Sequence, residues 1–192
     1  MSNTAANVSV GKPAVEGAIF RAPLGTTLPT DATTALANAY KGMGYVSEDG
    51  VTQSMTRETT EINAWGGDTV RNPLKKKTEK FKFTLIESQN IDVLKAVYGD
   101  GNVSGTLAAG LTLLSDSDEL DHAVWVIDRK TSDGGNSRTI IPDGQVTEVG
   151  DIVYKDDQAI GYEVTITAYP SALISGATSK EIRKTTVASG NS

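Results

Sequence analysis

The chain has 192 residues and a mass of 20.2 kDa, a length that favours one domain with extended arms. It contains no cysteine, which excludes disulfides and cysteine-ligated metal sites. The formal net charge of −6 argues against a protein that grips nucleic acid over its whole surface. The charge is uneven, because residues 71–82 carry a net of +5, which leaves −11 for the rest.

The first half predicts short strands and turns. The start of the chain, "MSNTAANVSVGKP", lacks the basic and apolar regions of a signal peptide, and the longest apolar run, Ala123–Ile127, is too short to cross a bilayer. Prolines and threonines in residues 21–40 suit an extended surface segment. Short strands are expected at Ala18–Phe20 and Met43–Ser47, followed by a hairpin turn at Glu48–Gly50.

The next strand, Val51–Thr60, is polar on both faces. Its composition, "VTQSMTRETT", suits a strand, but neither face is properly apolar, and such a strand is poorly specified unless partners hold it. We therefore expect a strand that is wetted on one side, as in a channel wall.

The segment Glu61–Lys77, "EINAWGGDTVRNPLKKK", places one of the two tryptophans, Trp65, in a Gly-Gly turn before a cluster of basic residues. A turn seldom carries so large an apolar ring without a surface to press against. Nucleic-acid binders usually interleave basic residues with aromatics, whereas the nearest aromatic here, Phe81, belongs to the expected core. A solvated loop and a contact with an acidic protein surface remain the two main interpretations.

A strand and a helix follow. In "FKFTLIE" the apolar side chains Phe81, Phe83 and Leu85 alternate with polar ones, which predicts a half-buried strand. Residues 88–99 predict a short helix capped by Ser88 or Asn90 and ended by Gly99. The expected inner face of this helix consists of Ile91, Leu94, Val97 and Tyr98.

The second half predicts consecutive antiparallel strands with no internal repeat. They are expected at Leu111–Leu114, Ala123–Asp128, Arg138–Ile141, Gln145–Val149, Ile152–Lys155 and 159–170, with a hairpin turn at Pro142–Gly144. In the last strand Tyr162, Val164, Ile166 and Ala168 should face inward. The expected fold is mainly β: an antiparallel β-sandwich or barrel with one short flanking α-helix, a long loop and extended terminal arms.

No group of residues predicts catalysis or a metal site. His122 follows an acidic run of possible oxygen ligands, but the spacing lacks the glycine and the terminal glutamate of an EF-hand loop. The run consists of Asp116, Asp118, Glu119 and Asp121. The sequence has no nucleophile elbow, P-loop or dinucleotide fingerprint. We therefore expect no enzymatic activity and no catalytic, cofactor-binding or metal-binding residues.

The order of several segments resembles the major tail tube proteins of long-tailed (siphovirus-type) bacteriophages. The segments are "NVSVGKPAVEGAIFRAPLGTTLPTDATTAL", "GYVSEDGVTQSMTRETTEINAWGGDTVR", "FKFTLIESQNIDVLKAVYG" and "GYEVTITAYP", which together run from Asn7 to Pro170. The resemblance implies a structural virion protein that forms hexameric rings. The rings would stack into a β-lined tube, through which phage DNA passes into the host without sequence-specific binding.

The resemblance also implies where the chain works and with what. Residues 1–170 would form the tube domain, 61–77 a long assembly loop, and 171–192 a C-terminal arm that is flexible in the free subunit. Its partners would be further copies of itself and other tail proteins such as an initiator and a terminator. It would assemble in the host cytoplasm and reside in the tail tube of the virion, with no cofactor and no insertion into a membrane.

Two sets of residues are expected to serve assembly. The candidate contacts between subunits are Trp65, Gly66, Gly67, Asp68, Arg71, Lys75, Lys76 and Lys77. The candidate lumen-facing residues are Thr52, Ser54, Thr56 and Glu58, which would give a lumen of Glu, Thr and Ser that repels phosphates. In the rival interpretation of the loop, Trp65 packs on the core of its own subunit.

Two alternatives to a siphovirus-type tube stay open. The first is a carbohydrate-binding or adhesin-like β-sandwich on a virion surface, which should expose a platform of aromatic rings. Aromatic residues make up only 6% of the chain and mostly occupy expected core positions, which disfavours it. The second is the inner-tube subunit of a contractile injection system, which shares the fold.

Overall fold

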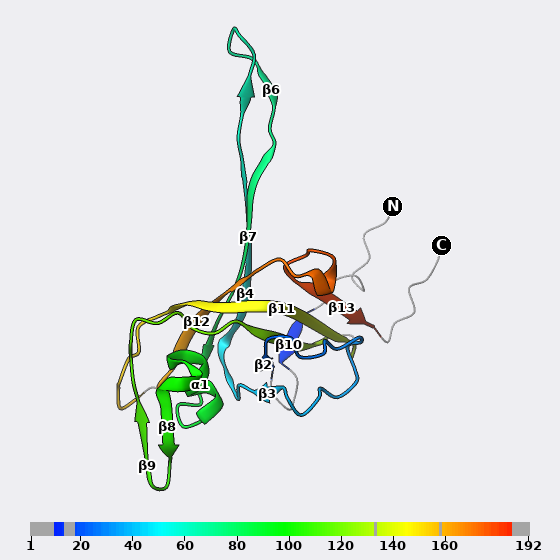
Figure 1. Cartoon of the computed structure of the whole chain (residues 1–192). Coiled ribbons are helices and arrows are strands. Elements are labelled where there is room, and N and C mark those ends of the chain that lie inside the picture. The colour runs from blue at the N-terminus through cyan, green and yellow to red at the C-terminus, as the bar shows by residue number, and fades with distance from the viewer. Residues whose placement is uncertain (1–9, 14–17, 133, 158, 186–192) are drawn as a thin grey trace.

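The protein is built on one large antiparallel sheet (Figure 1). A computed structural model describes residues 10–13, 18–132, 134–157 and 159–185. The nine-stranded sheet has the order β3-β2-β10-β11-β12-β7-β4, with β1 paired to β10 and β13 paired to β11. Its strands are β1 (Gly11–Pro13), β2 (Ile19–Pro23), β3 (Lys41–Gly42), β4 (Val46–Thr59), β7 (Leu74–Leu85), β10 (Ala123–Thr131), β11 (Asn136–Val149), β12 (Tyr162–Ala168) and β13 (Lys180–Lys184).

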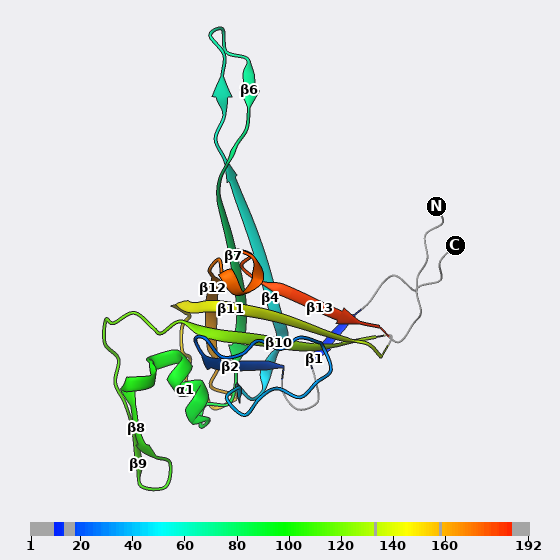
Figure 2. The ribbon, with the colours of Figure 1, turned by 45° about the vertical axis from the view of Figure 1, so that its right-hand side comes forward.

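Two small hairpins project from opposite ends of the molecule (Figures 1 and 2). At one end β5 (Ile62–Asn63) pairs with β6 (Thr69–Arg71) where β4 and β7 are joined. At the other end β8 (Val103–Thr106) pairs with β9 (Gly110–Leu113), next to the helix. The helical elements are α1 (Ile91–Tyr98) and the 3-10 turns η2 (Asp100–Asn102) and η3 (Ala172–Ile174).

The predicted fold class is confirmed. Strands account for 51% of the chain and helix for 8%, the sheets are antiparallel, and α1 is the flanking helix. Within the described ranges the sheet does not close into a barrel, and the architecture is consistent with a β-sandwich.

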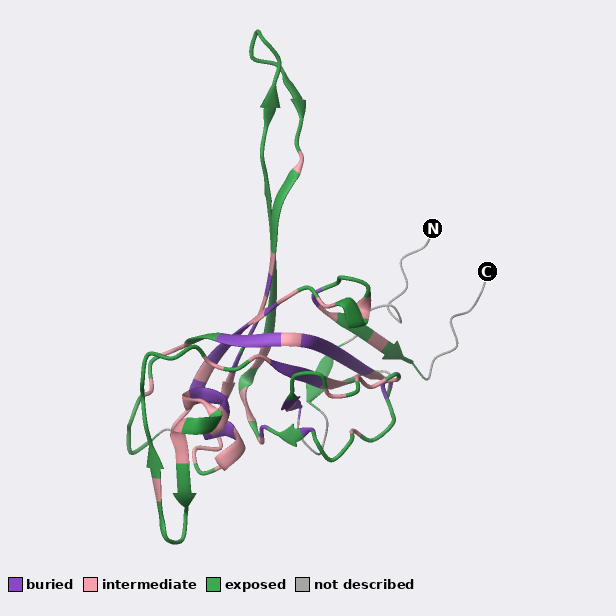
Figure 3. Ribbon diagram, in the orientation of Figure 1, coloured by how far each residue is buried: buried purple, intermediate pink, exposed green. Residues whose placement is uncertain are grey.

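The main core lies on one face of the sheet, under α1 (Figure 3). The inward side chains predicted for the strands at 81–85 and 162–168 are all buried there, which confirms both alternation patterns. Trp125 packs against Phe83 with ring centroids 6.3 Å apart, and its indole N–H donates to the carbonyl of Gly144 at 3.2 Å. A Cβ at Gly144 would lie 2.8 Å from the Trp125 ring, so this contact requires glycine.

A second apolar cluster lies on the opposite face of β2, β10 and β11. It contains Val124, Val126 and Ile140, and residues 24–40 cover it through Tyr40 and Leu36. The predicted surface segment therefore also shields the outer face of the sheet.

The helix is confirmed in both bounds and capping. Asn90 is the N-cap, with its side-chain oxygen accepting from the Asp92 amide at 3.0 Å, and Gly99 ends the helix at a φ of 101°. The inner face differs slightly from the prediction, because Val93 is fully buried whereas Ile91 is only half-buried.

Two predicted turns and one predicted strand are wrong. Glu48–Gly50 is not a hairpin turn: β4 runs through it as a bulge, which Gly50 accommodates at a φ of 69°. Pro142–Gly144 is not a turn either, because β11 bulges there against β10 and continues along β12, where Gly144 pairs with Ala168. Ile152–Lys155 forms no strand and belongs to the connection between β11 and β12.

The segment after Pro170 turns back onto the sheet. Ser171 caps the η3 turn by accepting from the Leu173 amide, and β13 then pairs with β11. Residues 186–192 lie outside the described residues. The flexibility of the arm in the free subunit stays a prediction.

The carboxylate of Glu79 joins this C-terminal segment to the base of the β4–β7 hairpin. The side chain is buried, and it accepts from Gln53 of β4 at 2.6 Å, from Ser179 at 2.8 Å and from Thr178. The Lys77 ammonium completes the cluster, 3.4 Å from a carboxylate oxygen of Glu79. Burial alone would raise the pKa of Glu79, but the hydrogen bonds and the lysine charge outweigh burial and lower it below its ordinary value.

We expect Glu79→Gln to destabilise the subunit by about 1–3 kcal/mol at neutral pH, because its donors lose a charged acceptor. Since the folded-state pKa is lowered, this stabilisation is present above the unfolded-state value and is lost as the pH falls through the folded-state value. The gap between wild type and variant in free energy of unfolding should therefore narrow below about pH 4.5. Denaturant unfolding at several pH values checks this, with the exposed Glu61→Gln as control; a gap independent of pH would contradict it.

Candidate assembly surfaces

The β4–β7 hairpin extends far beyond the core of the domain (Figures 1 and 3). The last buried residue on β7 toward the tip is Glu79, which pairs with Met55 of β4. Between these two residues and the far turn nearly every residue is exposed. At about 3.3 Å per residue the roughly ten residues from Met55 to the turn give a reach of about 30 Å. A projection this long makes few contacts with its own domain, so its side chains are available to another surface.

The tip of the hairpin, residues 61–72, presents Trp65 to solvent. The Ala64 amide donates to the Asp68 carbonyl at 2.8 Å and closes a tight turn. Gly66 and Gly67 have φ values of 129° and 99°, which other residues adopt only with strain, so both glycines are needed for this turn. Trp65 is fully exposed. The rival interpretation, in which Trp65 packs on the core of its own subunit, is wrong.

Further apolar and basic side chains accompany Trp65. Ile62, Val70 and Leu74 are exposed on the hairpin, as are Arg71 and Lys75. Solvent-exposed apolar side chains next to positive charges are typical of a surface that another protein covers.

The lysine run is divided between the two faces of β7. Lys76 pairs with Glu58 on one face, whereas Lys77 turns to the other, where its ammonium donates to Thr178 at 2.9 Å and contacts Glu79. Lys77 thus stabilises its own subunit, and Lys76 remains exposed on the hairpin.

The four candidate lumen residues lie on one face of β4, as period-two alternation requires. Each stands opposite a residue of β7 on the same face. The pairs are Thr52 with Lys82, Ser54 with Lys80, Thr56 with Thr78, and Glu58 with Lys76. On the next strand, β12, Thr165 and Thr167 pair with Lys82 and Lys80. We call these residues of β4, β7 and β12 the polar face.

The face that carries the predicted Glu, Thr and Ser side chains also contains lysines, which β7 contributes. Lys82 forms an ion pair with Glu163 at 2.8 Å, and this hydrogen bond raises the pKa of Lys82. The sequence carried the signal: the alternation that places Phe81 and Phe83 inside also places Lys80 and Lys82 on the opposite face. The face therefore combines hydroxyl groups with charges of both signs.

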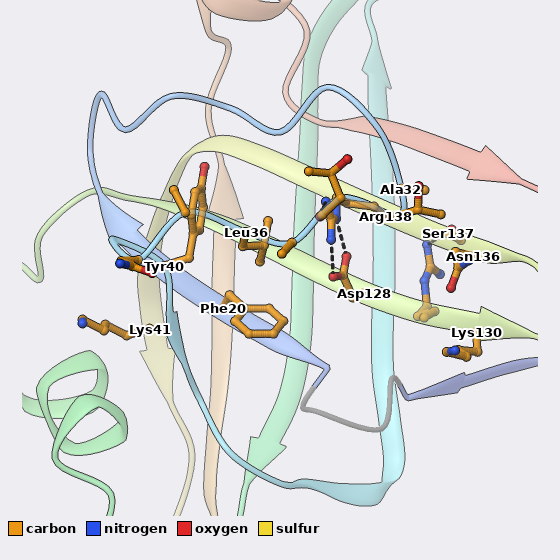
Figure 4. Close-up of a pocket in the computed structure, with 16 residues that line it drawn as sticks. Phe20, Ala32, Leu36, Tyr40, Lys41, Asp128, Lys130, Asn136, Ser137 and Arg138 are labelled. Carbon is orange, nitrogen blue, oxygen red and sulfur yellow. Dashed lines mark hydrogen bonds and ion pairs between the residues drawn. The ribbon is translucent and has the colours of Figure 1, made fainter.

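A pocket of about 930 Å³ lies beneath residues 32–41, and Arg138, which lines it, is committed to the fold (Figure 4). Arg138 binds Asp128 through two hydrogen bonds of 2.7 Å, and its remaining terminal nitrogen donates to the carbonyls of Asp31 and Thr34. The guanidinium is fully used in holding the covering segment on the sheet.

His122 and the acidic run before it form no metal site in the part of the chain that the structure describes. His122 lies 2.5 Å from a carboxylate oxygen of Asp143 and packs against the Tyr169 ring. Across the same ranges, no helix has the length and hydrophobicity needed to cross a bilayer.

Comparison with known proteins identifies the family. A family model described as phage tail tube protein matches residues 4–178, most of the chain. No curated protein matches the sequence. The matched family consists of structural proteins that assemble with other proteins of the virion tail, and it is not a class of enzymes. By the match to this family model and its mainly β fold, the chain belongs to the phage tail tube protein family.

Proposed function

We propose that this chain polymerises as stacked hexameric rings into the tail tube of a siphovirus-type phage, a conduit for DNA delivery into the host. The observation that carries the proposal beyond family membership is the β4–β7 hairpin, which holds Trp65 and basic side chains far from the core. Electron microscopy of the purified chain tests it, with rings or tubes as the expected result.

The ring contact would use the outer edge of β4. This strand ends the sheet, so within the described residues one of its edges has no strand partner. A long unpaired edge is a ready template for a further strand, and pairing it with the next subunit would remove it. Six such contacts would join the sheets of a ring into one continuous wall.

The polar face, apart from Lys76 at its outer end, would line the channel. Its hydroxyl groups offer DNA phosphates only weak contacts, and the carboxylates of Glu58 and Glu163 offset the charge of nearby lysines. Balanced charges release few counterions on contact with DNA, so binding would be weak and independent of sequence. The DNA would therefore pass without being held.

The contact between rings would be made by the tip. Trp65 would be the apolar anchor on the turn of Gly66, Gly67 and Asp68, and Arg71, Lys75 and Lys76 would face an acidic surface. Lys77 would support this contact from the base of the hairpin, through Glu79. An initiator would start the stack and a terminator would end it, in the host cytoplasm.

Deleting residues 62–76 should leave a folded subunit that forms no tubes. The deletion spares the pairing of Arg57 with Lys77 and leaves residues 58–61 as a short connection. Because the removed residues are almost all exposed, the melting temperature should change little. Electron microscopy and thermal unfolding check both halves of this prediction, and normal tubes would refute it.

The two tryptophans form a matched pair of test positions. Trp65 is fully exposed and Trp125 is 1% exposed, so only the second contributes to the core. We expect Trp65→Ala to change the free energy of unfolding by less than about 0.5 kcal/mol and to weaken tube formation. Trp125→Ala should cost about 3–5 kcal/mol. Unfolding curves and pelleting of tubes measure the two effects; a large loss of stability in Trp65→Ala would contradict the assignment.

A further inference from the structure

The hairpin β8–β9 carries an apolar surface at the end of the molecule opposite the tip. The segment 103–114, "VSGTLAAGLTLL", has no charged residue. Leu107, Leu113 and Leu114 on it are exposed, although large apolar side chains gain free energy when water is excluded from them. An uncharged, exposed hairpin of this kind indicates a surface that a partner covers.

An acidic stretch follows this hairpin directly. The side chains of Asp118, Glu119 and Asp121 are exposed and form no ion pair with any other described residue. Asp118 and Glu119 border a shallow hollow of about 340 Å³, together with Glu148 of β11. Leu120, Val146 and Val149 add apolar lining to it. The hollow thus combines apolar and polar lining, the latter from Gln145 and Thr147, with an acidic rim.

The tip has the complementary properties. Ile62, Trp65 and Val70 are its exposed apolar side chains, and Arg71 with Lys75 supplies positive charge beside them. Charge complementarity of this kind steers two surfaces together and fixes their register, while the apolar side chains supply the affinity.

The positions of the two surfaces suit a repeated contact. The tip and the β8–β9 hairpin lie at opposite ends of the molecule in both views (Figures 1 and 2). A second copy displaced along the direction of the β4–β7 hairpin would present its β8–β9 end to the tip of the first. When two unlike surfaces of identical chains make the contact, one end of the stack keeps a free tip and the other end keeps a free β8–β9 surface. Further copies can therefore add without limit.

We propose that residues 103–121, together with the hollow beside β11, form the surface that receives the tip of a subunit in the next ring. The inference rests on the proposed function, because it names the partner surface of the same stacking contact. Trp65 packs against the exposed leucines of the β8–β9 hairpin, and Arg71, Lys75 and Lys76 face Asp118, Glu119 and Asp121.

Charge reversal on either side tests the electrostatic pairing. The variant Asp118→Lys/Glu119→Lys/Asp121→Lys and the variant Arg71→Glu/Lys75→Glu/Lys76→Glu should each raise the protein concentration needed for tubes by about tenfold or more. All six changes in one chain restore opposite charges and should recover assembly. That recovery excludes misfolding as the cause of either defect. If the combined variant assembles no better than the single sets, the pairing is wrong.

Cross-linking between introduced thiols tests the contact itself, since the chain has no cysteine of its own. Ala64 on the tip, Ala108 on the β8–β9 hairpin and Ala35 on the segment 24–40 are all exposed. With a short thiol cross-linker, tubes of Ala64→Cys/Ala108→Cys should give a ladder of dimers, trimers and longer products. Single variants and Ala64→Cys/Ala35→Cys should give no ladder.

The outcomes separate the inference from the proposed function. If tubes form normally but Ala64→Cys/Ala108→Cys gives no ladder, residues 103–121 do not receive the tip. The proposed tube function would still stand. A ladder with Ala35→Cys instead would place the tip on the segment 24–40, also against the inference. If wild type forms neither rings nor tubes in the electron microscope, the proposed function fails, and the inference fails with it.

Discussion

Burying the carboxylate of Glu79 costs free energy unless donors surround it, and its donors come from separate parts of the chain. Gln53 lies on β4, Lys77 on β7 itself, and Thr178 and Ser179 lie just before β13. A single acceptor therefore ties the C-terminal segment to the base of the hairpin. The hairpin has few other contacts beyond this level, so this cluster and the pairing of β7 with β12 as far as Glu79 hold its base on the domain.

Local patterns predicted those elements whose side chains alternate between core and solvent. Phe81 to Leu85 and Tyr162 to Ala168 follow period two, and the helix at 91–98 has its own cap at each end. The bulges at Gly50 and at Pro142–Gly144 were mistaken for turns because a bulge uses the same residue types. A bulge differs from a turn because the chain stays paired with the same sheet on both sides of it. The partner strands that decide this are distant in sequence.

Alternation alone places Thr52, Ser54, Thr56 and Glu58 on one face of β4. The sequence left open whether Trp65 packs on its own subunit, and only the structure shows that its ring is exposed. The alternation of β7 places Lys80 and Lys82 opposite its core face, but the sequence of neither strand shows that β4 pairs with β7 so that these lysines join the face of Thr52 to Glu58. The contact of Lys77 with its own subunit depends on the tertiary structure in the same way, because its partners Glu79 and Thr178 meet only in the folded chain.

The regular pairing of β4 with β7 also limits how such a hairpin can change in length. Adding one residue to each strand would turn every side chain beyond that point to the opposite side, and Trp65 with them. Only pairs of residues per strand, about 7 Å of extra reach each, preserve the orientation of the tip. If the hairpin joins successive rings, their spacing in tubes built this way can evolve by discrete increments but not continuously.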